Sequence, residues 1–153
     1  MRRAIPFLLL FVFAGTSNAA DHISAGLGLT HGGMGVEWLR TFEPSRTGVA
    51  LGIGVLGVGG RVQYRFAPPA SLSSTYVSAG ALVMPWETNA YSDARAMGFI
   101  EGGWQVAARD GSSLYGDIGA GIGRTVGPRT RGNVYVPTFR LLVGWRFGGR
   151  SGA

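Results

Sequence analysis

Residues 139–147, with the sequence FRLLVGWRF, decide the fold class of this chain. Every second residue, from Phe139 through Leu141 to Phe147, is bulky and apolar, and the residues between them include Arg140, Gly144 and Arg146. Strict alternation over this length is typical of a β-strand, because successive side chains point to opposite faces. The stretch therefore predicts a strand with one bulky apolar face and one face of small and charged residues.

The same alternation recurs along the chain, and glycine, at 27 of 153 residues, occupies many of the alternate positions. In segment 48–55, Gly48 and Gly52 also have the four-residue spacing of helix-packing motifs. We favour a strand there, because each glycine disfavours a helix by roughly 1 kcal/mol relative to alanine. Either face of segment 75–84 is mostly apolar or small, so its register stays open. The predicted strands are 23–30, 34–42, 48–55, 61–66, 75–84, 97–108, 114–123 and 135–147.

The charges within these strands separate the two faces. Only Arg40 lies on the bulky apolar face, whereas seven charged residues lie on the glycine-rich face. An eight-stranded barrel has an interior just wide enough to be filled by side chains, and small residues leave space there for large ionic ones. We therefore expect an ionic network inside the barrel, with acids and arginines nearly balanced, made of Glu37, Arg61, Arg65, Glu101, Asp117, Arg140 and Arg146.

The apolar face then looks outward, where it would expose far more hydrophobic area than a soluble protein tolerates. Hydrocarbon is the natural surrounding, and closure pairs the backbone groups without water. The fold class predicted is all-β, an eight-stranded antiparallel up-and-down transmembrane β-barrel. If the chain starts in the periplasm, aromatic residues gather toward the periplasmic end as an interfacial girdle: Trp38, Phe42, Tyr64, Phe66, Tyr76, Trp104, Trp145 and Phe147.

The N-terminus is typical of an export signal. Arg2 and Arg3 precede an apolar stretch over 5–14, and small residues follow at 17–20. We expect residues 1–20 to be a cleaved signal peptide and 21–153 to be the barrel. Without Arg2 and Arg3 the chain has a formal charge of about +4, but its arginines form no run or stripe, so we expect no nucleic-acid partner.

With these features in place, the chain resembles the small eight-stranded outer-membrane β-barrel proteins, such as the OmpA transmembrane domain and the OmpX-type barrels. The resemblance lies in the signal peptide, the eight predicted strands and the final strand 139–147. It implies insertion by the barrel-assembly machinery, which reads a last strand ending in an aromatic residue. Here residues 148–153 extend past Phe147, so the aromatic residue is not the last one.

For function, we expect a structural or surface-interaction protein of the bacterial outer membrane, without enzymatic activity, cofactor or metal. Its partners would be outer-membrane lipids and lipopolysaccharide, whose phosphates Arg129 and Arg131 could pair with. Loops 85–95 and 125–133 would offer the surface for an unknown ligand. The ionic cluster is interpreted as a structural plug, with an ion path as the alternative.

Two other functions stay open. One is a lipid A-modifying hydrolase using His31, with Ser24 or Thr30 as partner; related deacylases carry a His-x-Ser pair, but Gly32 and Gly33 follow His31 here. The other is a secreted soluble barrel that carries an apolar ligand. We expect His22 to lie near the mature N-terminus and His31 in a surface turn. With no cysteine in the chain, thiolate chemistry is excluded.

Overall fold

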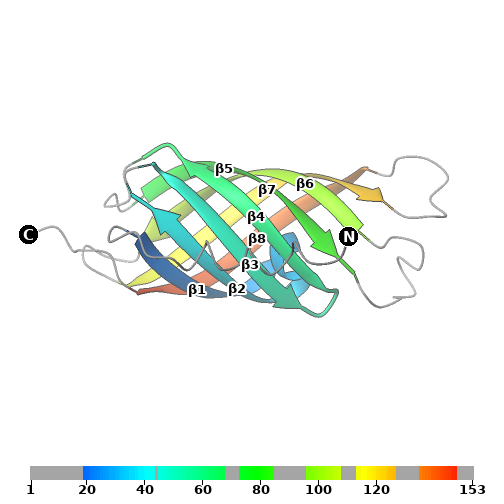
Figure 1. Cartoon of the computed structure of the whole chain (residues 1–153), viewed down its shortest axis with the longest axis horizontal. Coiled ribbons are helices and arrows are strands. Elements are labelled where there is room, and N and C mark those ends of the chain that lie inside the picture. The colour runs from blue at the N-terminus through cyan, green and yellow to red at the C-terminus, as the bar shows by residue number, and fades with distance from the viewer. Residues whose placement is uncertain are drawn as a thin grey trace, which may run out of the picture.

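The computed structural model describes residues 19–43, 45–67, 73–84, 96–107, 113–126 and 135–147. These residues form a closed barrel in which each strand pairs with the next, and the last pairs with the first (Figure 1). The predicted all-β, eight-stranded antiparallel up-and-down barrel is confirmed. Its strands are β1 (Ala19–Gly28), β2 (Gly33–Phe42), β3 (Thr47–Gly54), β4 (Val58–Arg65), β5 (Ser73–Val83), β6 (Ala96–Ala107), β7 (Leu114–Val126) and β8 (Tyr135–Phe147).

Side chains alternate between the two faces of the wall as the sequence pattern predicts. In β8, residues with odd numbers such as Leu141 and Trp145 are exposed on the outside, whereas Arg140 and Leu142 are buried inside. The structure also fixes the register of β5, which pairs with β4 from Val58↔Val83 onward. Ser74, Ser78 and Gly80 point inward together with Tyr76, so Tyr76 is an interior residue and its predicted place in the aromatic girdle was wrong.

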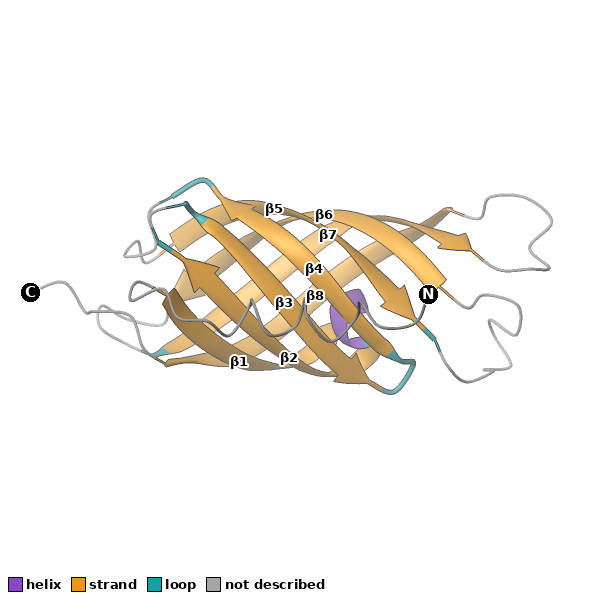
Figure 2. Cartoon of the chain, viewed as in Figure 1, coloured by secondary structure: helices purple, strands orange, loops and turns teal. Residues whose placement is uncertain are grey.

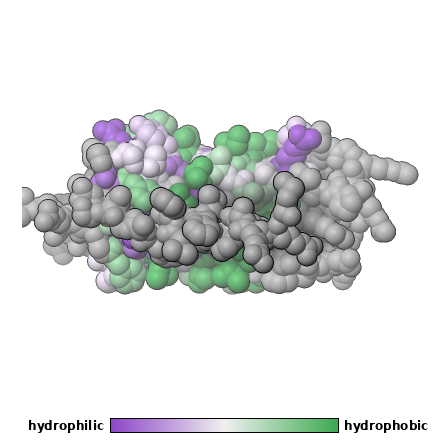
Figure 3. Space-filling view, viewed as in Figure 1, coloured by the Kyte–Doolittle hydropathy of each residue, from purple (hydrophilic) through white to green (hydrophobic). Residues whose placement is uncertain are grey.

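The outside of the barrel carries large hydrophobic side chains from every strand. Ile118 on β7 and Leu141 on β8 are 55% and 56% exposed, and they lie opposite one another in the register. Figure 3 shows hydrophobic atoms over much of the visible wall, with the strongest hydrophilic colour toward its two ends. The exterior is therefore more apolar than the interior, the reverse of a soluble barrel.

The connection between β1 and β2 folds into the barrel. β1 ends at Gly28, two residues before the predicted end, and Leu29–His31 form a 3₁₀ turn, η1, that contacts β3 and β4 (Figure 2). Thr30 and His31 are 0% exposed, so the expectation that His31 lies in a surface turn was wrong.

Glycines on β3 and β4 make this inward turn sterically feasible. A Cβ atom on Gly54 would lie 1.8 Å from the carbonyl oxygen of His31, and one on Gly59 would lie 2.4 Å from that of Thr30. Any side chain at these positions would occupy the space of the turn.

Among the described residues, no helix is long and apolar enough to cross a membrane.

Candidate functional site

The barrel interior gathers six of the seven predicted ionic residues into one buried group. Its acids are 1–2% exposed and its arginines 1–6% exposed. Three carboxylates and three guanidinium groups are buried inside the barrel, so the formal charges of this enclosed set balance, which is what burial requires. The six, which we call the interior network, are Glu37, Arg61, Arg65, Glu101, Asp117 and Arg140.

The first part of the interior network is a forked ion pair between β2 and β4. Arg61 donates from Nη2 to Glu37 Oε1 over 2.7 Å and from Nε to Glu37 Oε2 over 3.2 Å. Two parallel bonds of this kind fix both side chains in orientation as well as distance. Arg61 also donates to Gln63 Oε1, and its Nη2 lies 3.7 Å from Asp117 Oδ2 on the far side of the barrel.

Tyr76 on β5 joins the two halves of the interior network. Its hydroxyl donates to Asp117 Oδ1 over 2.6 Å and accepts from Arg140 Nη1 over 3.2 Å. Both Arg61 and Arg140 also lie over its ring, with Cζ at 5.4 and 5.7 Å from the ring centroid. Asp117 is held further by Gln105, whose Nε2 donates to Oδ2 over 2.9 Å. The phenol therefore bridges a carboxylate and two cations.

Arg140 connects the network to the inward turn. It donates to Glu101 Oε2 on β6 and, over 3.2 Å, to Thr30 Oγ1 in η1. These bonds tie β8 to β6 and to the inward turn between β1 and β2. A continuous chain of polar contacts thus crosses the barrel, from Glu37 through Arg61, Asp117, Tyr76 and Arg140 to Glu101.

Glycines opposite the large interior side chains provide the space for them. A Cβ on Gly103 would lie 2.3 Å from the Tyr76 ring, and one on Gly119 would lie 2.9 Å from its hydroxyl oxygen. Tyr76 was missed as an interior residue because its strand has no clear polar face. One signal was available: Tyr76 shares its parity with Ser74, Ser78 and Gly80, the small residues that mark the inner face of the other strands.

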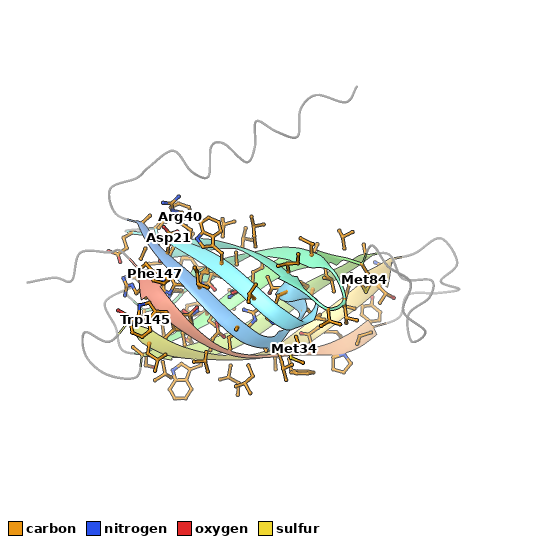
Figure 4. All side chains as sticks on the ribbon, turned by 90° about the horizontal axis from the view of Figure 1, so that it is seen from below. Asp21, Met34, Arg40, Met84, Trp145 and Phe147 are labelled. Atoms are coloured by element: carbon orange, nitrogen blue, oxygen red, sulfur yellow. The ribbon has the colours of Figure 1, made fainter. Side chains whose placement is uncertain are left out.

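The seventh predicted residue, Arg146, lies at the rim rather than in the enclosed group. Its side chain is 28% exposed, and its Nη2 lies 3.5 Å from Glu43 Oε1. Arg40, the predicted exception on the apolar face, pairs there with Asp21 across 3.4 Å. Figure 4 shows Asp21 and Arg40 together at the end of the barrel that also carries Trp145 and Phe147. Both rim pairs sit at strand ends, away from the middle of the wall.

The remaining predicted girdle residues all lie on the outer face. Trp38 on β2 and Trp145 on β8 both pair with Ile23 of β1, so they stand at one level on either side of that strand. Tyr64 and Phe66 meet edge to face, with centroids 5.5 Å apart. Except for Tyr76, the predicted set forms a band around the barrel end at which β1 begins: Trp38, Phe42, Tyr64, Phe66, Trp104, Trp145 and Phe147.

The chain matches no protein-family model, no curated protein and no solved structure.

The two histidines are both interior side chains with hydrogen bonds. His22 Nε2 lies 3.3 Å from Thr41 Oγ1, and His31 Nε2 lies 3.2 Å from the carbonyl oxygen of Gly26. The two hydroxyls predicted as possible partners of His31 make other hydrogen bonds. Ser24 donates to the carbonyl oxygen of Glu37, and Thr30 accepts from Arg140. Within the described ranges, no cluster of three or more ligating side chains suits a metal ion.

Several predicted features lie outside the described residues. They are residues 1–18 of the signal peptide, loop 85–95, and all of 125–133 except Thr125 and Val126, which end β7. Ala19 and Ala20, at the predicted cleavage point, are the first two residues of β1.

Proposed function

We propose that this chain is an outer-membrane β-barrel protein with a structural or surface-interaction role, whose interior is closed by a salt-bridge network. The lipid of the outer membrane would surround the barrel wall, lipopolysaccharide would contact its outer end, and the barrel-assembly machinery would insert it. The proposal gives the chain no enzymatic activity.

The distribution of apolar and charged side chains carries this proposal. Among the described residues, twenty-five large hydrophobic ones are at least 36% exposed, and every one of the eight strands contributes to them. Meanwhile the guanidinium and carboxylate groups of Arg61, Glu37, Arg140 and Glu101 are 0% exposed. Water around the wall would leave this apolar area unburied, whereas hydrocarbon solvates it. Because the barrel is closed, neighbouring strands also pair most of the backbone N–H and C=O groups, and few of them would lack a hydrogen bond in lipid.

The aromatic band supports the same placement. Tryptophan and tyrosine favour the boundary between hydrocarbon and headgroups, because one part of each ring system is apolar and another is polar. Here Trp104 donates its ring N–H to Ser73 at the outer surface, so its polar edge is engaged near the strand end. The partly buried pair of Arg40 and Asp21 on the outer face lies at the same end, at the level where charges would meet water.

Cell fractionation followed by a heat-modifiability gel tests the proposal. The full chain, expressed in a Gram-negative host, should enter the outer-membrane fraction and migrate faster before boiling than after it, since a closed barrel resists unfolding in cold detergent. A chain that stays in the soluble periplasmic fraction without detergent would contradict the membrane placement and favour a soluble carrier of apolar ligands.

A further inference from the structure

The seam between β1 and β8 is paired over only part of its length. The pairing runs from Asp21↔Phe147 to Leu27↔Leu141, and β1 ends one residue later because the chain turns inward into η1. β8 extends further, and its first residues, 135–139, pair with β7 alone among the described strands. Pro137, which has no N–H to leave unpaired, lies in this stretch. The wall is thus interrupted beside the inward turn.

A cavity of about 270 Å³ lies at this interruption, and we call it the seam pocket. Three of its lining residues, Leu27, Met34 and Phe139, are outer side chains with 40%, 63% and 64% exposure. Two others, Leu82 and Met97, are buried interior side chains with 0% and 5% exposure. Residues from both faces of the wall therefore line one cavity, which lies at the barrel end where β1 ends and β8 begins.

The lining of the seam pocket is chemically uniform. Among the described residues that line it, none has a charged side chain, and Thr138 is the one with a side-chain hydroxyl. On the inner side of the pocket, Leu29 of η1 packs against a buried cluster of Leu82, Met84 and Met97. Two of the lining residues are labelled in Figure 4: Met34 of β2, on the outside of the wall, and Met84, the residue after β5.

This chemistry selects a hydrocarbon occupant. An apolar cavity of roughly 150 Å³ stays dry and accepts benzene, so a larger one of the same character has room for a short length of alkyl chain. Methionine side chains adapt to such a guest because they are unbranched and polarisable. We propose that the seam pocket takes in the end of a lipid acyl chain, which enters sideways from the bilayer between β8 and the inward turn.

The inference rests on the proposed function, since the outer opening faces hydrocarbon only if the wall is in a membrane. The lipid headgroup would stay outside, because the described residues of the lining offer no charged partner for it. The inward turn widens the site: had β1 continued to residue 30 as an ordinary strand in the same register, it would have paired with β8 as far as Thr138.

Photocrosslinking from the acyl chain tests the inference. The full chain is refolded into phosphatidylcholine vesicles that contain a small fraction of phosphatidylcholine with a diazirine near the end of one acyl chain. After irradiation, mass spectrometry maps the adducts. We expect adducts at Leu82 or Met97 inside the barrel, in addition to adducts at outer positions such as Ile118 and Leu141.

Filling the pocket should remove the interior adducts. Leu82→Trp places a bulky side chain in the pocket, and we expect loss of the Met97 adduct while the outer adducts persist. Val77→Trp, on the outer face of the same strand, is the matched control and should leave the Met97 adduct unchanged. Heat-modifiable migration verifies that each variant is folded, and if Leu82→Trp does not fold, the wild-type map decides.

The outcomes separate the inference from the proposed function. Adducts confined to the outer positions would overturn the seam pocket as a lipid site and leave the membrane placement intact. A Met97 adduct that persists in folded Leu82→Trp would also overturn it. An absence of adducts at Ile118 and Leu141 would overturn the membrane placement and the seam-pocket inference together.

Discussion

Arg140 shows at the level of a single residue what the barrel interior demands. Its guanidinium is fully buried, and it contacts Glu101, Tyr76 and Thr30 from three different elements. A buried charge is tolerated only with partners, because the charge has lost its hydration. Glu101 is buried as well and pairs with Arg140, so removal of either side chain leaves the charge of the other buried without its partner.

Substitution of Arg140 by alanine should therefore destabilise the barrel strongly. It leaves the Glu101 carboxylate unpaired and buried, which typically costs about 3–5 kcal/mol. Arg40→Ala removes an arginine from the outer rim pair instead and should cost less, because the Asp21 side chain is 37% exposed and can be hydrated. Urea unfolding in lipid vesicles, followed by heat-modifiable migration, measures both. Equal midpoints for the two variants would show that Glu101 does not depend on Arg140.

Tyr76→Phe isolates the hydroxyl at the centre of the network. The ring stays over Gly103, but Asp117 loses a donor and Arg140 loses an acceptor, and hydrogen bonds to charged groups are worth about 1.5–3 kcal/mol. Tyr64→Phe, on the outer face, is the matched control and should change the unfolding midpoint little. A neutral result for Tyr76→Phe would contradict its bridging role.

The element that departs most from a simple barrel is the turn between β1 and β2. In place of an outward hairpin, η1 enters the interior and is held by the bond from Arg140 to Thr30 and by that from His31 to the Gly26 carbonyl. The glycines of β3 and β4 form the floor against which the turn packs. The turn also determines where the β1–β8 seam stops, and so where the seam pocket opens.

Gly54→Val tests the packing of this turn. The added side chain would meet the carbonyl oxygens of His31 and Met34, which are backbone atoms and cannot rotate away. We expect a loss of stability of about 1–3 kcal/mol, as for other overpacked sites. Gly98→Val is the matched control, since a Cβ there meets nothing within 4 Å. A stable Gly54→Val variant would show that the turn does not occupy this space.

For the whole molecule, the decisive property is that the apolar face is outside. If hydrocarbon surrounds the wall, a charge at mid-strand on the outer face faces the centre of the bilayer, whereas a charge at a strand end faces the headgroups. The free-energy cost of placing a charge on the outer face then depends on its depth in the bilayer. A wall surrounded by water would show no such dependence.

Leu141→Arg and Tyr135→Arg measure this depth dependence on one strand. Leu141 is the central residue of β8 and Tyr135 its first, and both point outward. We expect the first variant to lose about 2–4 kcal/mol in vesicles and the second about 0–1 kcal/mol. Urea unfolding of the vesicle-inserted protein gives both values. Equal and small effects would mean that the wall does not face hydrocarbon.

The conductance of the whole barrel tests the proposed closure. Six enclosed ions, Tyr76 and the inward turn occupy the interior, so liposomes with the wild-type protein should pass small ions no faster than protein-free liposomes. Ion flux at porin-like rates would show that the network lines a path and does not plug it.

The sequence by itself determined the eight strands, the inner and outer faces of all of them except β5, and six of the seven predicted members of the ionic network. These follow from alternation along each strand, which is local: Arg61 and Glu101 are assigned inward by their immediate neighbours. It also placed seven of the eight girdle residues. The assignment failed at Tyr76, where both parities of β5 are apolar or small and alternation carries no information.

Only the tertiary structure decided which charges pair, that Tyr76 joins them, and that the first turn folds inward. The partners of Arg140 lie 39, 64 and 110 residues away along the chain, and the closure of β8 on β1 brings them together. The inward turn likewise depends on space left by glycines on two other strands. Such features arise from contacts between distant segments, so no local pattern specifies them.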